Sequence, residues 1–184
     1  MNEIPLEKIK EDIEAAEKPS GFPVKLIAID GHGGAGKSTL AQKLAGLLNA
    51  QIINLDDFDS VLERGQYRPK LEEEILKPIQ QGIKKLSYKR TSWWPDHHPE
   101  PVKDQPVTPI MILEGASSAR KEFRPYLTYA IWVETPMEIC MKRGLERDGQ
   151  KARKRWEEWF AKEEKYIKRD NPQDYADIIV SGND

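Results

Sequence analysis

The sequence predicts an α/β fold in which a five-stranded parallel β-sheet lies between layers of helices. Short apolar segments rich in β-branched residues alternate along the chain with segments whose apolar residues recur at helical spacing. Parallel strands need helical crossovers, so this alternation favours a parallel sheet. A glycine-rich segment also separates the first strand from its helix, which places a candidate ligand-binding loop at the edge of the sheet.

Length and composition restrict the classes of protein to which this chain can belong. The 184 residues carry 29 basic and 31 acidic side chains, a net charge of −2, and 38% of them are hydrophobic. One domain spanning residues 1–184 accounts for this length. The near-neutral balance argues against nucleic acid as a partner. No apolar run reaches the roughly 20 residues that a membrane-spanning helix needs, so we expect no membrane association.

The N-terminal residues and the cysteine content indicate where the protein acts. The first residues lack the basic and apolar regions of a signal peptide. The single cysteine, Cys140, excludes an intrachain disulfide and a cysteine-based metal cluster, and we expect it to be buried as a small apolar residue. We therefore expect a cytoplasmic protein. A homo-oligomer is neither indicated nor excluded by the sequence.

The first part of the chain is predicted to form a helix and the start of the sheet. An amphipathic helix is expected within residues 1–20, and the prolines and glycine of 18–23 end it. A nearly continuous apolar strand follows at 24–30, then a helix at 37–48 and a second strand at 51–55.

The alternation of strands and helices is interrupted at residues 60–109, which we interpret as an insertion beside the sheet. Residues 70–86 are predicted to be helical, whereas residues 93–109 contain five prolines and are predicted to form a stiff loop. The remaining strands are predicted at 110–113, 129–133 and 176–180. Before the last strand, Thr135, Pro136 and Glu138 have the pattern of a helix start with a capping box, and Gly149 marks the helix end.

The glycine-rich segment at residues 31–38 has the spacing G-x-x-x-x-G-K-[ST] of a phosphate-binding loop. Its glycines allow backbone N–H groups to face phosphate oxygens, and the following helix adds the positive end of its dipole. Lys37 contributes a positive charge and Ser38 a ligand for Mg²⁺. The segment predicts a site for ATP, or another nucleoside triphosphate, with Mg²⁺. The predicted nucleotide-binding residues are Gly31, His32, Gly33, Gly34, Ala35, Gly36, Lys37, Ser38 and Thr39.

Carboxylates follow two of the predicted strands, at the sheet edge where the loop lies. Asp56 and Asp57 come directly after the second strand, where they can orient or deprotonate an acceptor hydroxyl. Glu114 ends the third strand and can reach Mg²⁺ through water. The alternative interpretations are a solvated acidic turn and an ordinary strand end.

Two arginines of the helix after the fourth strand are candidates for binding the transferring phosphates. Arg143 and Arg147 are four residues apart and share one helix face, so their guanidinium groups can act together on phosphates. A basic surface helix is the alternative. We interpret residues 143–170 as a lid and the helix that follows it. The aromatic residues of that helix, Trp156, Trp159 and Phe160, are predicted to pack into the core.

Together these motifs resemble the uridine kinase and phosphoribulokinase family. The resemblance covers about residues 24–150, and its segments occur in the family's order. They are the phosphate-binding loop, Asp56-Asp-Phe58, Leu71-Glu-Glu-Glu-Ile-Leu-Lys-Pro78, Leu113-Glu-Gly115 and Arg143 to Asp148. The resemblance implies the fold of the phosphate-binding-loop (P-loop) nucleotide-binding proteins. It also implies ATP-dependent phosphoryl transfer to a hydroxyl of a small molecule, in the first place a nucleoside.

The resemblance implies roles for individual residues. Asp56 corresponds to the general base, with Asp57 beside it as the second candidate, and Glu114 corresponds to the carboxylate near magnesium. Arg143 and Arg147 correspond to lid residues over the triphosphate, with Arg147 beside adenine.

The acceptor side departs from the family's pattern. The segment that holds the nucleoside in the family corresponds to Arg90-Thr-Ser-Trp93-Trp94. Arg90, Trp93 and Trp94 are therefore candidate acceptor contacts, together with Asp56. A second lid arginine of the family is replaced here by Gly144.

Other interpretations remain open at this point. His97 and His98, between Asp96 and Glu100, contain the residue types of a metal site, although neighbouring histidines rarely share one metal ion. The chain could be a kinase for a vitamin, sugar or antibiotic hydroxyl. It could also be a nucleotide-binding regulatory protein with slow ATP hydrolysis. The acidic cluster favours a kinase, because a regulatory switch needs no base for an acceptor.

Overall fold

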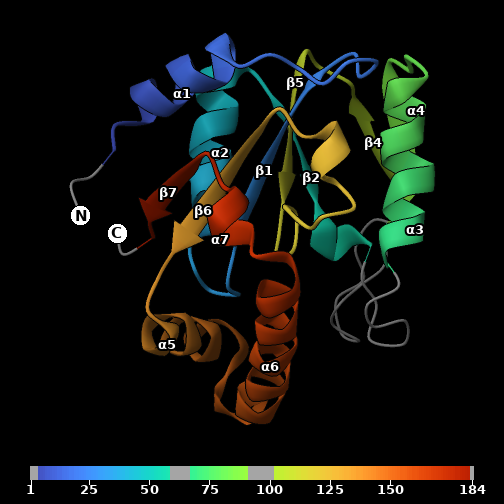
Figure 1. Cartoon of the computed structure of the whole chain (residues 1–184). Helices are drawn as coiled ribbons and strands as arrows, with labels where there is room; N and C mark the ends of the chain where they lie inside the picture. Colours follow the sequence, from blue (N-terminus) through green and yellow to red (C-terminus); the bar gives the residue numbers. More distant parts are fainter. Residues whose placement is uncertain (1–3, 59–66, 91–101, 183–184) are drawn as a thin grey trace.

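A five-stranded parallel sheet forms the centre of the computed structural model (Figure 1), which describes residues 4–58, 67–90 and 102–182. The strand order is β2-β5-β1-β6-β7, and every neighbouring pair is parallel. The strands are β1 (Lys25–Gly31), β2 (Gln51–Asn54), β5 (Ile110–Glu114), β6 (Tyr129–Glu134) and β7 (Ile178–Ser181). The predicted α/β fold with a five-stranded parallel sheet is therefore confirmed.

Apolar side chains of the sheet supply two cores, one on each face. In β1, Leu26 and Ala28 face one core, and Ile27 and Ile29 face the other. This alternation explains why the strand is apolar at nearly every position, as a strand covered on both faces must be. The first core includes the helical segment after β2, and the second includes side chains of α1, α2, α5 and α6.

The N-terminal elements follow the predicted pattern closely. Helix α1 (Leu6–Ala15) precedes β1, and α2 (Lys37–Leu48) connects β1 to β2. A short 3-10 helix, η1 (Leu55–Asp57), continues directly from β2. Its backbone is capped by Asn54, whose Oδ1 accepts a hydrogen bond from the Asp56 amide at 2.8 Å. This cap fixes the backbone of the candidate base at the carboxyl edge of the sheet.

The segment between β2 and β5 differs from the prediction. A helical stretch occurs, but it ends at Gln80 instead of Leu86, because the chain turns at Gly82, whose φ of +84° favours glycine. Residues that we expected to be helical or loop form an antiparallel hairpin. The elements are α3 (Tyr67–Leu71), the π-helical segment η2 (Glu72–Leu76), α4 (Lys77–Gln80), β3 (Lys85–Lys89) and β4 (Val102–Pro106).

The C-terminal part runs from β5 through β6 to β7, and its helices α5 and α6 lie below the sheet in Figure 1. Its helices are η3 (Arg124–Tyr126), α5 (Met137–Asp148), η4 (Gln150–Ala152), α6 (Arg153–Asp170) and α7 (Pro172–Tyr175). Gly149 ends α5 as predicted. The predicted capping box is wrong, because α5 begins at Met137 and no side chain caps it. None of the helices among the described residues has the length and apolar character to cross a membrane.

Candidate active site

The phosphate-binding loop connects β1 to the N-terminus of α2. Gly36 precedes the first residue of α2, so the free amides of this helix open onto the loop. Gly34 has a φ of +79°, and a Cβ there would lie 2.5 Å from the carbonyl oxygen of Cys140 in α5. Glycine is therefore required both by the backbone conformation and by the close approach of α5.

Lys37 and Ser38, the first two residues of α2, form hydrogen bonds with different parts of the chain. Lys37 is buried, and its Nζ donates a hydrogen bond to the carbonyl oxygen of His32 at 2.8 Å. The Ser38 hydroxyl donates to Oε1 of Glu114 at 3.2 Å. The loop, the first turn of α2 and the end of β5 thus meet at one point, as the sequence predicted.

Glu114 has the surroundings of a cation ligand. Its carboxylate is only 4% exposed, and burial raises its pKa, with Asp56 and Asp30 acting in the same direction. Lys37 and the Ser38 hydroxyl oppose this rise. A Mg²⁺ ion held by Ser38 and Glu114 would add positive charge where carboxylates repel one another, and both supply the oxygen ligands that Mg²⁺ prefers.

No group of three or more His, Cys, Asp or Glu side chains among the described residues is arranged to hold a metal ion. Two protein ligands suit Mg²⁺ in a nucleotide site, where the ion keeps several waters and binds phosphate oxygens. The donor set therefore fits a nucleotide-associated Mg²⁺ and does not resemble a closed structural metal site.

Asp56 lies at the edge of the same cluster of charges. Its side chain reaches solvent, but the protein surrounding it displaces enough water to raise its pKa. The positive charges of Lys37 and Arg147 oppose this rise, whereas Asp57 and Glu163 add to it. A carboxylate with a raised pKa that still reaches solvent has the properties of a general base.

Asp57 has different surroundings from its neighbour. Its carboxylate accepts hydrogen bonds from the Tyr88 hydroxyl and from Lys103 Nζ, both at 3.2 Å. Arg90 approaches it at 4.0 Å. These three partners come from β3, β4 and the residue after β3, so Asp57 connects η1 to the hairpin. Arg90, a predicted acceptor contact, thus lies beside Asp57.

The two predicted phosphate-binding arginines project from α5 to different places. Arg143 Nη1 donates to the carbonyl oxygens of Gly182 at 2.6 Å and Gly34 at 3.4 Å. Arg147 pairs with Asp148 at 2.8 Å, and its guanidinium carbon lies 5.5 Å from the centre of the Trp156 ring. Arg143 therefore contacts the phosphate-binding loop directly, whereas Arg147 lies near enough to Asp56 to lower its pKa.

Gly144 and Thr135 have roles that the sequence did not reveal. A Cβ at Gly144 would lie 2.5 Å from an indole carbon of Trp156, so the packing of Trp156 excludes any longer side chain at this position. The Thr135 hydroxyl donates to the carbonyl oxygen of Ala35 at 2.9 Å. This contact with the loop explains why Thr135 does not cap α5.

Asp30, the last polar residue before the loop, is a site residue that sequence reasoning missed. It is 1% exposed, and its Oδ1 accepts hydrogen bonds from the amides of Gly31 and Ser117 at 2.7 and 2.8 Å. Its Oδ2 accepts from the Ala119 amide at 2.8 Å and the Tyr166 hydroxyl at 2.6 Å. Asp30 therefore joins the start of the loop, the segment after Glu114 and helix α6.

Helix α6 carries a second missed residue, Glu163. Its carboxylate is 5% exposed and contacts His32 and Gly33 of the loop. The buried residues of α6 are Trp156, Phe160, Glu163, Tyr166 and Asp170. These residues recur at helical spacing and so share one face of the helix. Two acidic residues on this otherwise aromatic face were the sequence signal that could have indicated buried carboxylates. The predicted packing of the α6 aromatics is confirmed.

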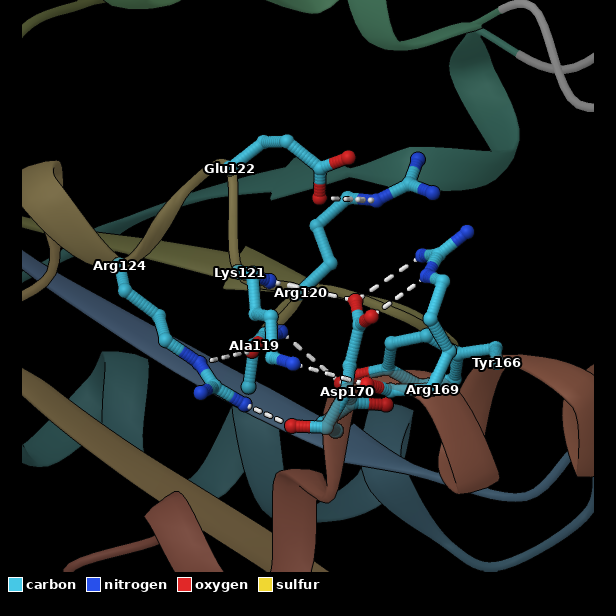
Figure 2. Close-up of polar contacts among 9 residues, drawn as sticks. Ala119, Arg120, Lys121, Glu122, Arg124, Tyr166, Arg169 and Asp170 are labelled. Atoms are coloured by element: carbon cyan, nitrogen blue, oxygen red, sulfur yellow. Dashed lines mark hydrogen bonds and ion pairs between the residues drawn. The ribbon is translucent and has the colours of Figure 1, made fainter.

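The C-terminal end of α6 is fastened to the segment after β5, as Figure 2 shows. The Arg124 guanidinium donates to the carbonyl oxygens of Ala119 at 3.1 Å and Asp170 at 2.5 Å. The Lys121 amide donates to Asp170 Oδ2 at 3.2 Å. Burial would raise the pKa of Asp170, but hydrogen bonds from Arg169 and the Lys121 amide outweigh burial and lower it.

Several predicted residues lie outside the described part of the chain. They are the candidate acceptor contacts Trp93 and Trp94 and the candidate metal ligands His97 and His98.

Comparison with known proteins identifies the fold. Over 95% of this chain and 96% of the other, the structure is similar to that of a possible uridine kinase from Bacillus stearothermophilus, with a TM-score of 0.68 and 17% identity. A candidate fructose transport system kinase from Silicibacter sp. TM1040 covers 96% of this chain and 98% of its own length, with a TM-score of 0.70 and 17% identity. The chain has a P-loop kinase fold. No protein-family model matches it, and no curated protein has a matching sequence.

Proposed function

We propose that this protein is an ATP- and Mg²⁺-dependent kinase that phosphorylates a hydroxyl of a small molecule. The observation that carries the proposal is the meeting of three groups at one edge of the sheet. They are the phosphate-binding loop with Lys37, the Ser38–Glu114 pair at 3.2 Å, and Asp56 with its raised pKa. Nucleotide binding alone needs the first two; a base for an acceptor is needed only for transfer to a second substrate.

The residues have separate roles in this proposal. The loop amides and Lys37 hold the phosphates and stabilise the charge that develops during transfer. Asp56 accepts the proton of the acceptor hydroxyl as that oxygen attacks the terminal phosphorus of ATP, the bond from this phosphorus to the bridging oxygen breaks, and ADP leaves. Arg143 and Arg147 contribute positive charge from α5. Mg²⁺, held by Ser38 and Glu114, would neutralise phosphate oxygens.

Asp56 is a better candidate for the base than Asp57. The Asp57 carboxylate already accepts hydrogen bonds from Tyr88 and Lys103, so it is engaged by groups of the protein and is less available to a substrate proton. We assign Asp57 the role of connecting η1 to the β3–β4 hairpin. In this arrangement Asp57 keeps Asp56 in position and places Arg90 beside the acceptor.

A nucleoside is the first acceptor class to test, and a sugar is the second. The family resemblance of the motifs favours a nucleoside. The similarity to a candidate fructose transport system kinase makes sugars the natural alternative. A panel of nucleosides, pantothenate-like compounds and sugars, assayed for ADP release, would separate these classes.

The proposal is tested by two separate substitutions, one of a residue that binds the phosphates of ATP and one of the residue that accepts the proton of the acceptor hydroxyl. Lys37→Ala should weaken ATP binding by about 10-fold or more, because a charge-assisted contact to phosphate is lost. Asp56→Asn should reduce turnover by about 100-fold or more, the usual contribution of general base catalysis, while ATP affinity changes little. Asp57→Asn is the matched variant and should retain more activity than Asp56→Asn.

Two results would contradict the proposed function. Unchanged ATP affinity in Lys37→Ala would contradict the proposal that the loop binds the nucleotide. ATP hydrolysis that no acceptor in the panel stimulates, with equal rates in Asp56→Asn and the wild type, would instead indicate the nucleotide-binding regulatory protein.

A further inference from the structure

A buried carboxylate of α6 contacts the beginning of the phosphate-binding loop. Glu163 Oε1 accepts a hydrogen bond from the Gly33 amide at 2.9 Å, and Oε2 lies 2.9 Å from His32 Nδ1. Trp159 Nε1 donates to Oε1 at 2.5 Å. Burying a carboxylate is costly unless donors satisfy it. Two of the three donors here belong to the loop, so Glu163 and the loop depend on each other.

The loop and α6 also fit each other in shape. A Cβ at Gly33 would lie 2.7 Å from a ring carbon of Trp156 and 3.2 Å from Trp159 Nε1. The His32 ring packs edge-on against Phe160, with 6.1 Å between ring centres. The loop backbone thus approaches α6 as closely as glycine permits, and the contact occurs at a tightly packed interface.

Helix α6 is held in place independently of Glu163. The Tyr166 hydroxyl donates to the buried Asp30 at 2.6 Å. The C-terminal end of the helix is bound by Lys121 and Arg124 (Figure 2). Because these contacts fix α6, the position of Glu163 does not depend on the loop. The contact between Glu163 and the loop therefore determines the position of the loop.

The contact continues to the lysine of the nucleotide site. His32 offers its ring to Glu163 and its carbonyl oxygen to Lys37 Nζ at 2.8 Å. We propose that Glu163 is a positioning residue for the phosphate-binding loop: it fixes His32 and Gly33, and through the His32 carbonyl it sets the place of the Lys37 ammonium. The inference rests on the proposed function only in taking the loop as a nucleotide site.

The experiment measures nucleotide affinity apart from turnover. Glu163→Ala removes the acceptor for Gly33 and His32 and should weaken binding of a non-hydrolysable ATP analogue by about 10-fold or more. Glu163→Gln should restore affinity to within about threefold of wild type, because its oxygen still accepts the Gly33 hydrogen bond and its side chain keeps the size and shape of glutamate. Glu164→Ala, at an exposed ion pair with Lys168, is the matched control and should bind as the wild type does.

Rescue by glutamine separates positioning from a loss of folding. Far-UV circular dichroism and thermal unfolding establish that each variant is folded. If Glu163→Ala does not fold, His32→Ala tests the same contact from the loop side and should weaken affinity by about threefold or more. Wild-type affinity in a folded Glu163→Ala, or in His32→Ala, would overturn the inference and leave the proposed function intact. Absence of analogue binding by the wild type would overturn both.

Discussion

Asp30 is expected to be a major contributor to stability, because one buried carboxylate satisfies four donors from three parts of the chain. In Asp30→Asn, the oxygen can keep the Gly31 and Ser117 amides, which both donate to Oδ1. The new amide group then faces the Ala119 amide and the Tyr166 hydroxyl, which both donate to Oδ2. The hydroxyl can turn and become an acceptor, but the Ala119 amide cannot.

The magnitude follows from this one unsatisfied amide. A buried N–H without an acceptor costs about 1–3 kcal/mol. For a chain of this size, 1 kcal/mol corresponds to about 2–4 °C in Tm. Asp30→Asn should therefore lower Tm by about 6 °C, taking the centre of both ranges. Burial raises the pKa of Asp30, which shows that its charged form is disfavoured in the folded protein. Removing the charge therefore offsets part of the stability lost in Asp30→Asn, so we do not expect a larger decrease in Tm.

Thermal unfolding followed by circular dichroism measures this effect. Asp12→Asn is a suitable control, because Asp12 pairs with Lys8 on the surface of α1, and its Tm should be close to that of the wild type. Asp30→Ala removes the acceptor for all four donors and should be less stable than Asp30→Asn. The reasoning is refuted if Asp30→Asn unfolds at the wild-type temperature.

Two further predictions concern α5 and Asp56, the proposed base. Gly144→Ala should destabilise the protein by about 1–3 kcal/mol, because its Cβ would meet Trp156 at 2.5 Å; Gly46→Ala, where no atom lies within 4 Å of the new Cβ, should be neutral or slightly stabilising, and equal denaturation midpoints would contradict this. For pH dependence, kcat/KM should fall as pH decreases through the raised pKa of Asp56, since the base must be ionised. Arg147→Gln removes a charge that lowers this pKa, so the acidic limb should move to higher pH; an unmoved limb would argue against Asp56 as the base.

The strands and the phosphate-binding loop could be predicted because their signals are local. A strand covered on both faces must be apolar at successive positions, as 24–30 is, and the loop needs glycines and a lysine at fixed spacing. The β3–β4 hairpin was missed although Leu86 and Tyr88 alternate with exposed residues in β3. Its strands are short, and they pair across residues 91–101, so no local pattern joins them.

Only part of the candidate active site could be predicted from the sequence. Lys37, Ser38 and Glu114 follow from motifs, and the structure brings them together. Glu163 could not be assigned a function from sequence, because a single acidic residue on an aromatic helix stripe indicates burial without naming its partner. That partner, the loop at His32 and Gly33, is about 130 residues away in the chain (131 and 130 positions).

The sequence by itself determined that this protein has a parallel α/β fold, a phosphate-binding loop, and carboxylates at the strand ends beside it. These features depend on residue type, spacing and position relative to a strand. Only the tertiary structure gave different surroundings to Asp56 and Asp57, two identical neighbours in sequence. The hairpin supplies Tyr88 and Lys103 to one carboxylate, while Lys37 and Arg147 act on the other. The environment of a charge, and hence its chemistry, is set by groups that folding brings from distant parts of the chain.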